Sequence, residues 1–396
     1  MITVDTDSFF AIVTVAALAA ITVAYLPKRF APPVVVLELM LGILIGPEVL
    51  DIAKTSDFVD FFANLGLGML FFFAGYEIDF ERIKGAPMKL GALGWFVSVG
   101  LAYGIGGALA AAGVVVSFLY TGSAMATTAI GTLIPILRDN GELKTRFGTF
   151  LLAAGAAGEF GPILLVTLVL STTNPLHEAV ILLAFVALAL VLALASVRFA
   201  WRGWPALERT FEASSQLAVR VTVVLVFGLV LLAGELGLDI LLGGFVAGMI
   251  TRLALRGQEL QVFESKLTAV GFGFFVPFFF VASGIEFDLA ALGSAEAIAK
   301  LFLFFALFLV VRGAPAMLLY RGVLSTRERA ALAFYSATEL PLVVAITTIA
   351  VEQGHMKSST AAGLVGAAML STLIFPFVGM ALRQGQSASG ESASTA

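Results

Sequence analysis

The sequence predicts an all-α polytopic membrane protein with thirteen transmembrane helices, arranged as two inverted six-helix repeats with discontinuous crossing helices. Three observations lead to this fold class: the composition, the placement of the basic residues, and a repeat with a period of seven apolar segments. Of the 396 residues, 60% are hydrophobic and 13% are charged, and the mean hydropathy is +1.02. Soluble domains are about 45–50% apolar and about 25% charged, so most of this chain is expected to lie in lipid.

The chain divides into thirteen apolar segments, each near the roughly 20 residues that one membrane crossing needs. They are expected near 8–26, 32–50, 58–76, 88–113, 115–137, 147–171, 176–199, 217–234, 239–254, 266–285, 297–320, 328–351 and 359–382. Two aspartates and no basic residue precede the first segment, which is therefore predicted to be a retained helix and not a cleaved signal peptide. The composition of 383–396 is typical of a disordered tail.

The basic residues segregate between alternate connections. With thirteen crossings, 19 of the 23 Lys and Arg residues fall on one side, Lys54, Lys300 and Lys357 fall on the other, and Arg312 lies inside a segment. Because connections rich in Lys and Arg stay in the cytoplasm, the N-terminus is expected outside and the C-terminus in the cytoplasm. A miscounted helix would scramble this pattern.

The same composition excludes several kinds of chemistry. The chain has no cysteine, which excludes disulfides, thiolate metal sites and cysteine nucleophiles. The net charge of −4 indicates no nucleic-acid partner. The glycines at 104–107 lie within an apolar helix with no strand before it, so they do not form a dinucleotide-binding loop. We expect no cofactor and no enzymatic reaction.

An internal repeat relates the two halves. LMLGILIGP at 39–47 returns as LLGGFVAGM at 241–249, and FFFAGYEID at 71–79 returns as FFFVASGIEFD at 278–288. These blocks pair segments 2 and 3 with segments 9 and 10, and an odd period of seven inverts the second copy, as in secondary transporters. Segments 1–6 and 8–13 are then the copies, with 176–199 as a bridge. The alternative is chance recurrence of such runs in apolar helices.

Segments 5 and 12 occupy matching positions, and both are predicted to be broken helices. The expected breaks are at Gly131 and Pro135 in segment 5 and at Pro341 in segment 12. Proline removes a helical hydrogen bond and frees carbonyl groups, which can bind a small cation together with the dipoles of the helix ends. The candidate ion ligands beside the breaks are Thr127, Thr128, Ser336, Thr338 and Glu339. The alternative is an ordinary proline kink.

Three charged residues lie at comparable depth in the apolar segments: Glu159, Arg312 and Glu339. Intramembrane acids are costly and usually mark an ion or proton path. Arginine stays protonated and binds carboxylates in a planar fork, so Arg312 is expected to neutralise one glutamate and leave the other free to titrate. We interpret Glu159 as the site where a monovalent cation and a proton compete. The alternative is a stabilising triad without a transport role.

Three stretches of sequence carry a family resemblance. GMLFFFAGYEIDFERIK at 68–84, ATTAI at 126–130 and the run from LGGFVAGMI to FGFFVPFFFVASGIEFDL at 242–289 resemble the monovalent cation/proton antiporter superfamily, in the branch of bacterial Na⁺/H⁺ antiporters and potassium-efflux membrane domains. The resemblance covers residues 1–382 and implies the Na⁺/H⁺ antiporter fold.

The resemblance also assigns roles to residues. Glu159 matches the ion-binding acid of the sixth helix, Thr127 and Thr128 match a Ser/Thr pair, and Glu339 matches the acid of the second crossing helix. In that family the sixth helix normally carries an aspartate preceded by Asp, Asn or Gln, whereas here Gly158 precedes a glutamate. Members of the family that have paired acids and a lysine tend to be electrogenic. This chain has one acid and Arg312 at the matching positions, which implies electroneutral one-for-one exchange.

The resemblance implies two functional parts in a bacterial-type plasma membrane. Residues 1–87 and 215–290 would form a scaffold that makes a homodimer, and 88–171 with 295–382 would form the moving core that carries the site. The Phe-rich faces of segments 3 and 10 would be a sliding seam or a lipid-facing surface.

The sequence therefore predicts a secondary antiporter that exchanges Na⁺ or K⁺ for H⁺ by alternating access. A channel-like K⁺ efflux pore is one alternative, and an organic-anion symporter on the related inverted-repeat fold is another. No repeated carbonyl filter sequence supports the pore, and only Arg312 could hold an organic carboxylate.

Overall fold

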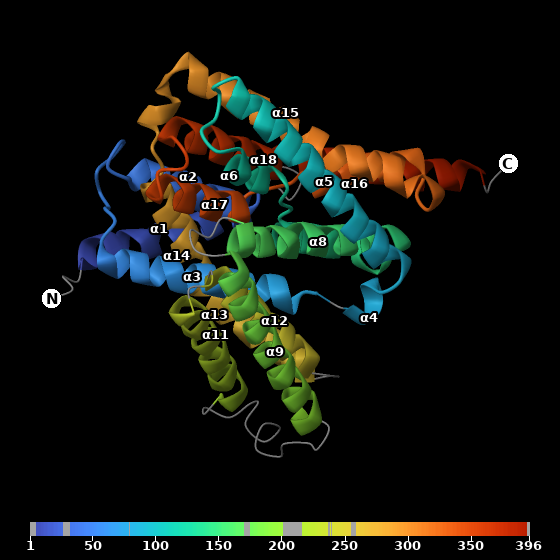
Figure 1. Cartoon of the computed structure of the whole chain (residues 1–396), viewed down its shortest axis with the longest axis horizontal. Helices are drawn as coiled ribbons and strands as arrows, with labels where there is room; N and C mark the ends of the chain where they lie inside the picture. The colour runs from blue at the N-terminus through green and yellow to red at the C-terminus, as the bar shows by residue number, and fades with distance from the viewer. Residues whose placement is uncertain are drawn as a thin grey trace. The chain divides into compact units, whose positions relative to one another are not determined.

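The computed structural model describes residues 5–26, 32–78, 80–169, 175–200, 216–236, 238, 240–254 and 259–393. In this part of the chain, helices joined by turns and loops are the only regular secondary structure (Figure 1). Nine of the described helices are long and apolar enough to cross a membrane, and four shorter apolar helices accompany them. These segments lie at the thirteen predicted positions, which confirms the predicted all-α membrane fold class.

The helices have the following bounds along the chain: α1 Thr6–Tyr25, α2 Val34–Ile45, α3 Asp57–Tyr76, α4 Phe80–Ile83, α5 Ala86–Ala111, α6 Phe118–Met125, α7 Ile130–Asp139, η1 Glu142–Lys144, α8 Arg146–Val169, α9 Pro175–Ala200, α11 Leu217–Glu235, α12 Ile240–Ala254, α13 Glu259–Val270, η2 Gly271–Phe275, α14 Val276–Ile285, η3 Ala290–Gly293, α15 Ala295–Leu319, η4 Tyr320–Gly322, α16 Thr326–Ser336, α17 Pro341–Glu352 and α18 Ser358–Ala393.

The chain folds into two compact units, each built from two pieces of sequence. Unit 1 consists of Met1–Asp79 and Ser171–Phe287, and unit 2 consists of Phe80–Leu170 and Asp288–Ala396. The helix α9, predicted as a bridge between the copies, belongs to unit 1, where it packs against α12.

Two helix crossings in unit 1 depend on glycine. The helix α2 meets α14 where Gly42 lies against Val281, and a Cβ at Gly284 would overlap the carbonyl of Leu39. The helix α3 meets α12 in the same way, because a Cβ at Gly75 would overlap the carbonyl of Phe245. Glycine allows such close backbone approach between membrane helices.

These crossings reflect the inverted repeat. Segment 2 (α2) packs on segment 10 (α14), and segment 9 (α12) packs on segment 3 (α3). The repeat pairs segment 2 with segment 9 and segment 3 with segment 10. Replacing both helices of the α2–α14 contact by their repeat partners therefore gives the α12–α3 contact, as expected for two copies related by a two-fold axis. The side chains of Phe71–Phe73 and Phe278–Phe280 are buried within unit 1, each at most 6% exposed, so they are core residues and not a lipid-facing surface.

We expect Gly284→Ala to lower the free energy of unfolding by about 1–3 kcal/mol, the usual cost of overpacking, because its new methyl group meets backbone that cannot move aside. Thermal unfolding of the purified protein measures this. The control is Gly228→Ala on α11 in the same unit, where an added Cβ meets nothing within 4 Å. Equal melting temperatures for the two variants would contradict the tight crossing.

Unit 2 has an ionic cluster around Arg383, in the C-terminal third of α18. The Arg383 guanidinium donates to both carboxylate oxygens of Glu142 at 2.9 and 3.0 Å and to Glu328 at 3.0 Å, and it lies 4.4 Å from the centre of the Phe147 ring. The cluster ties α18 to η1 and α16. Arg383 is the first residue of the stretch 383–396 that the sequence predicts to be disordered, and it lies on α18, which ends at Ala393.

Candidate functional site

Two unwound stretches in unit 2 interrupt the predicted crossing helices. Residues 126–129 separate α6 from α7, and residues 337–340 separate α16 from α17. Pro341 is the first residue of α17, a position where its missing amide hydrogen costs nothing.

The break in segment 5 lies earlier than predicted. Gly131 is the second residue of α7, and Pro135 also falls within α7, so neither residue interrupts the helix. The side chain of Pro135 lies outside the described part of the chain. The unwound stretch instead precedes both residues.

The two unwound stretches hydrogen-bond to each other. The backbone amide of Ala129 donates to the carbonyl of Thr338 at 2.8 Å, and the Thr128 hydroxyl donates to the carbonyl of Ser336 at 2.6 Å. The amide of Thr128 donates to the carbonyl of Gly158 on α8 at 3.0 Å. These bonds bring four helix ends together, the carbonyl ends of α6 and α16 and the amide ends of α7 and α17, so dipoles of both signs meet at one place.

Glu159 lies on α8 beside this meeting point. Its side chain is 5% exposed, and the backbone amide of Gly131, in the first turn of α7, donates to its carboxyl group. The second carboxyl oxygen, Oε2, is buried and has no hydrogen-bond partner among the described residues. Gly131 therefore presents a donor to the predicted ion-binding acid.

Glu339 lies in the unwound stretch 337–340 and is completely buried. The Ser371 hydroxyl accepts from its backbone amide at 3.0 Å, and the Thr372 hydroxyl donates to its carbonyl at 3.2 Å. Both carboxyl oxygens lack a hydrogen-bond partner among the described residues, with the Thr127 side chain nearby. The backbone of Glu339 is thus held by hydrogen bonds, whereas its carboxyl group is not.

Among the described residues, Arg312 on α15 makes no direct hydrogen bond to a carboxylate, so the predicted neutralisation of a glutamate would act through electrostatic attraction and not through a paired fork. Its Nε and Nη2 donate to the Thr128 hydroxyl at 3.0 and 2.8 Å, and its Nη1 donates to the Ser98 hydroxyl at 3.1 Å. It also donates to the carbonyls of Ala154 at 3.3 Å and Ser336 at 3.4 Å. Four of the five N–H groups of the guanidinium donate to these neutral oxygens, and Glu339 is within electrostatic range of it.

The predicted ligands therefore come together in unit 2, although several act through different atoms than expected. Ser336 and Thr338 contribute backbone carbonyls, and the Thr127 hydroxyl donates to the carbonyl of Ala124 at 3.0 Å. Sequence reasoning missed the buried hydroxyl groups of Ser98, Ser371 and Thr372. These residues could have been found in the sequence as isolated hydroxyl residues in the apolar segments 4 and 13, because such residues often form hydrogen bonds between membrane helices.

Gly158 departs from the residues usual at that position in the resembling family, and its surroundings give the reason. A Cβ there would overlap Arg312 Nη2 and lie 2.6 Å from the Thr128 hydroxyl. The space that a side chain would need at 158 is occupied by the guanidinium and its acceptor.

We therefore expect Gly158→Ala to displace Arg312, to slow transport and to lower the free energy of unfolding by about 1–3 kcal/mol. Thermal unfolding and flux in proteoliposomes measure the two effects. The control is Gly104→Ala on α5, where an added Cβ meets nothing within 4 Å. Parent-like stability and flux of Gly158→Ala would contradict the packing around Arg312.

A family model described as the transmembrane sodium/hydrogen exchanger matches residues 13–381. The chain belongs to the sodium/hydrogen exchanger family. Among its relatives are the protein YjbQ of Bacillus subtilis (strain 168), 26% identical over 88% of this chain, and the Na⁺/H⁺-K⁺ antiporter GerN of Bacillus cereus, 28% identical over 68% of this chain and 69% of GerN. The chain spans 58% of the length of YjbQ.

A solved structure shares the fold of this sodium/hydrogen exchanger family member. The sodium proton antiporter MjNhaP1 of Methanocaldococcus jannaschii superposes with a TM-score of 0.66, covering 94% of this chain and 96% of the other, at 17% sequence identity. This similarity confirms the predicted antiporter fold.

Proposed function

We propose that the chain exchanges a monovalent cation, Na⁺ or K⁺, for H⁺ by alternating access, with the Glu159 carboxyl as the shared site. The observation that carries this proposal is the buried, unpartnered oxygen of Glu159 beside two unwound helices. A carboxylate away from water is stable only when it is protonated or paired with a positive charge. We infer that at Glu159 either a bound proton or a bound cation neutralises the carboxylate.

The surroundings of Glu159 support a cation as the partner. The unwound stretches place backbone carbonyls and hydroxyls near the acid, and hard monovalent cations bind such oxygens. The described residues hold no cluster of three or more His, Asp or Glu side chains that would suit a metal ion. The single carboxylate with neutral oxygens around it therefore favours a monovalent ion.

The partition of charge between the two glutamates supports one-for-one exchange. Arg312 is within electrostatic range of Glu339, and we infer that it offsets the negative charge of this acid whenever the acid is ionised. The charge of Glu159 is then balanced by whichever ion is bound. One acid that carries either one cation or one proton moves no net charge per cycle.

The assembly and orientation form part of the proposal. We infer a homodimer in a bacterial-type plasma membrane, with the N-terminus outside and the C-terminus in the cytoplasm. Unit 1 would make the dimer contact and unit 2 would be the moving part, as the sequence resemblance implies. Thiol labelling of single cysteines placed near Lys54 and Lys144 in the cysteine-free chain tests the orientation.

Flux through proteoliposomes tests the function. With an imposed pH gradient, addition of Na⁺ or K⁺ is expected to dissipate the gradient, and valinomycin with balanced K⁺ should leave the rate of Na⁺-driven proton movement unchanged. Cation flux without proton movement would favour a pore. Proton movement that requires an organic anion and no alkali cation would favour a symporter.

A further inference from the structure

The carboxyl group of Glu339 depends on its own backbone for its position. The side chain is completely buried, and neither carboxyl oxygen has a hydrogen-bond partner among the described residues. The rotamers that a side chain can adopt are limited by the backbone that carries it. The groups that hold the backbone at Glu339 therefore decide where this acid can lie.

The helix break removes both backbone hydrogen bonds that a continuous helix would give Glu339. In a continuous helix its amide would donate to the carbonyl of Tyr335, and its carbonyl would accept from the amide of Val343. The carbonyl of Tyr335 instead accepts from the amide of Thr338 at 3.2 Å, and α17 begins only at Pro341. The amide and the carbonyl of Glu339 need other partners, because an unpaired buried backbone group is costly.

Two hydroxyl groups of α18 supply these partners. The Ser371 hydroxyl accepts from the amide of Glu339 at 3.0 Å, and the Thr372 hydroxyl donates to its carbonyl at 3.2 Å. The proton of Ser371 can go to the same carbonyl, at 3.1 Å, or to the carbonyl of Ala368, at 2.8 Å. Both hydroxyl side chains are 0% exposed, so water does not replace them.

The inverted repeat gives this contact a counterpart in the first copy. Thr128 and Glu339 end the matching tripeptides Ala-Thr-Thr and Ala-Thr-Glu, so they are equivalent positions. The amide of Thr128 donates to the carbonyl of Gly158 on α8, the last helix of the first copy. The amide of Glu339 donates to Ser371 on α18, the last helix of the second copy. Each last helix thus holds the equivalent amide, but only the second copy does so with a side chain.

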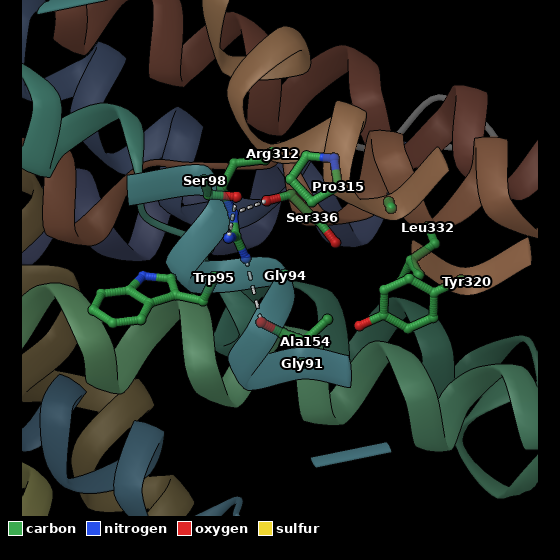
Figure 2. Close-up of a pocket in the computed structure, with 11 residues that line it drawn as sticks. Gly91, Gly94, Trp95, Ser98, Ala154, Arg312, Pro315, Tyr320, Leu332 and Ser336 are labelled. Carbon is green, nitrogen blue, oxygen red and sulfur yellow. Dashed lines mark hydrogen bonds between the residues drawn. The ribbon is translucent and has the colours of Figure 1, made fainter. Parts of the chain in front are cut away.

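The positive charge nearest in effect to this acid is held by other groups. Figure 2 shows the Arg312 guanidinium among the oxygens of three helices, with hydrogen bonds to Ser98 of α5, Ala154 of α8 and Ser336 of α16. Glu339 is within electrostatic range of this guanidinium. Because the guanidinium is fixed independently, the backbone at Glu339 sets the separation of the two charges.

We propose that Ser371 and Thr372 are positioning residues, which keep the carboxyl group of Glu339 where it offsets the charge of Arg312. The proposal rests on the proposed exchange of a cation for a proton at Glu159. The guanidinium lies against the neighbouring residue of α8, and a guanidinium without a counter-charge repels a cation. Loss of the Ser371 hydroxyl should therefore raise the KM for the cation several-fold, with a smaller effect on kcat.

Amide hydrogen exchange of the purified full chain tests the contact without any transport. Ser371→Ala removes the acceptor of the Glu339 amide, so exchange in a peptide that covers 337–340 should become several-fold faster. Ser371→Thr keeps a hydroxyl group on the same carbon and should restore slow exchange. Parent-like exchange at 337–340 in a folded Ser371→Ala protein would overturn the proposal.

Cation-driven proton movement in proteoliposomes tests the consequence for the site. Ser371→Ala should raise the KM for Na⁺ or K⁺ several-fold, and Ser371→Thr should restore most of the parent value. The control is Ser8→Ala in unit 1, whose hydroxyl is also buried and accepts the amide of Lys54 at 2.9 Å. A merely structural loss lowers the folded fraction and leaves KM unchanged, as expected for Ser8→Ala. Ser371→Ala with a parent KM would overturn the positioning role.

A second pair of variants keeps the test decisive if Ser371→Ala does not fold. Thr372→Val keeps the shape of the side chain and removes the other donor to Glu339, so KM should rise. Its control is Thr347→Val on α17, whose buried hydroxyl donates only to carbonyls of its own helix. Equal KM values for these two variants would contradict the proposal. A parent that moves no protons with either cation would contradict the proposed function, and hydrogen exchange at 337–340 would still decide whether α18 holds Glu339.

Discussion

Replacing Glu159 by glutamine is expected to abolish cation-driven proton movement in proteoliposomes while the protein stays folded. Glutamine keeps the size of the side chain and can still accept from the Gly131 amide, but it carries no charge and releases no proton. The substitution also removes the charge that makes burial of this group costly, so we expect unchanged or raised stability. Flux and thermal unfolding of the same preparation measure both effects.

The matched control for this experiment is Glu38→Gln. Glu38 is also a buried carboxyl group of an apolar helix, at 3% exposed, but it lies on α2 of unit 1. Its replacement is expected to leave the exchange rate close to that of the parent. Undiminished exchange by Glu159→Gln, or equal loss in both variants, would rule out the central role of Glu159.

Replacing Arg312 by alanine is expected to be the most destabilising change at the site. The substitution removes hydrogen bonds to Thr128 and Ser98 and to the carbonyls of Ala154 and Ser336. It also removes a positive charge that is within electrostatic range of the buried Glu339. Each buried polar group that loses its hydrogen-bond partner costs about 1–3 kcal/mol, and several such groups are left here. A large fall in melting temperature is the measurable result.

The control is Arg321→Ala, at an exposed arginine of η4 in the same unit. That variant is expected to melt within experimental error of the parent. If Arg312→Ala melts as Arg321→Ala does, the hydrogen-bond network around Arg312 does not stabilise unit 2.

The fold could be predicted because it rests on local properties of the sequence. A membrane crossing needs a minimum length of apolar residues, and alternation of basic connections checks the count. The repeat was visible because the crossings of α2 with α14 and of α3 with α12 both require glycine, which leaves the same small-residue blocks in both halves.

The details of the site could not be predicted because they rest on contacts between distant segments. The prolines predicted the correct pair of broken helices. The position of the break at 126–129 depends on hydrogen bonds from Ala129 to Thr338 and from Thr128 to Gly158, which join distant segments and cannot be predicted from a local pattern. Glutamate was expected to partner Arg312 because charges attract. Hydroxyls and carbonyls from several helices can satisfy guanidinium N–H groups as well as a carboxylate can, and here they accept from four of the five.

The most direct test of the central claim is the release of protons when a cation binds. The purified protein, in weak buffer with a pH indicator and at a pH where the free carboxyl group is protonated, is expected to release about one proton for each Na⁺ or K⁺ that it binds, because the two ligands compete for one carboxyl group. Glu159→Gln should release none. Cation binding without proton release by the parent, or equal release by the variant, would contradict a shared site at Glu159.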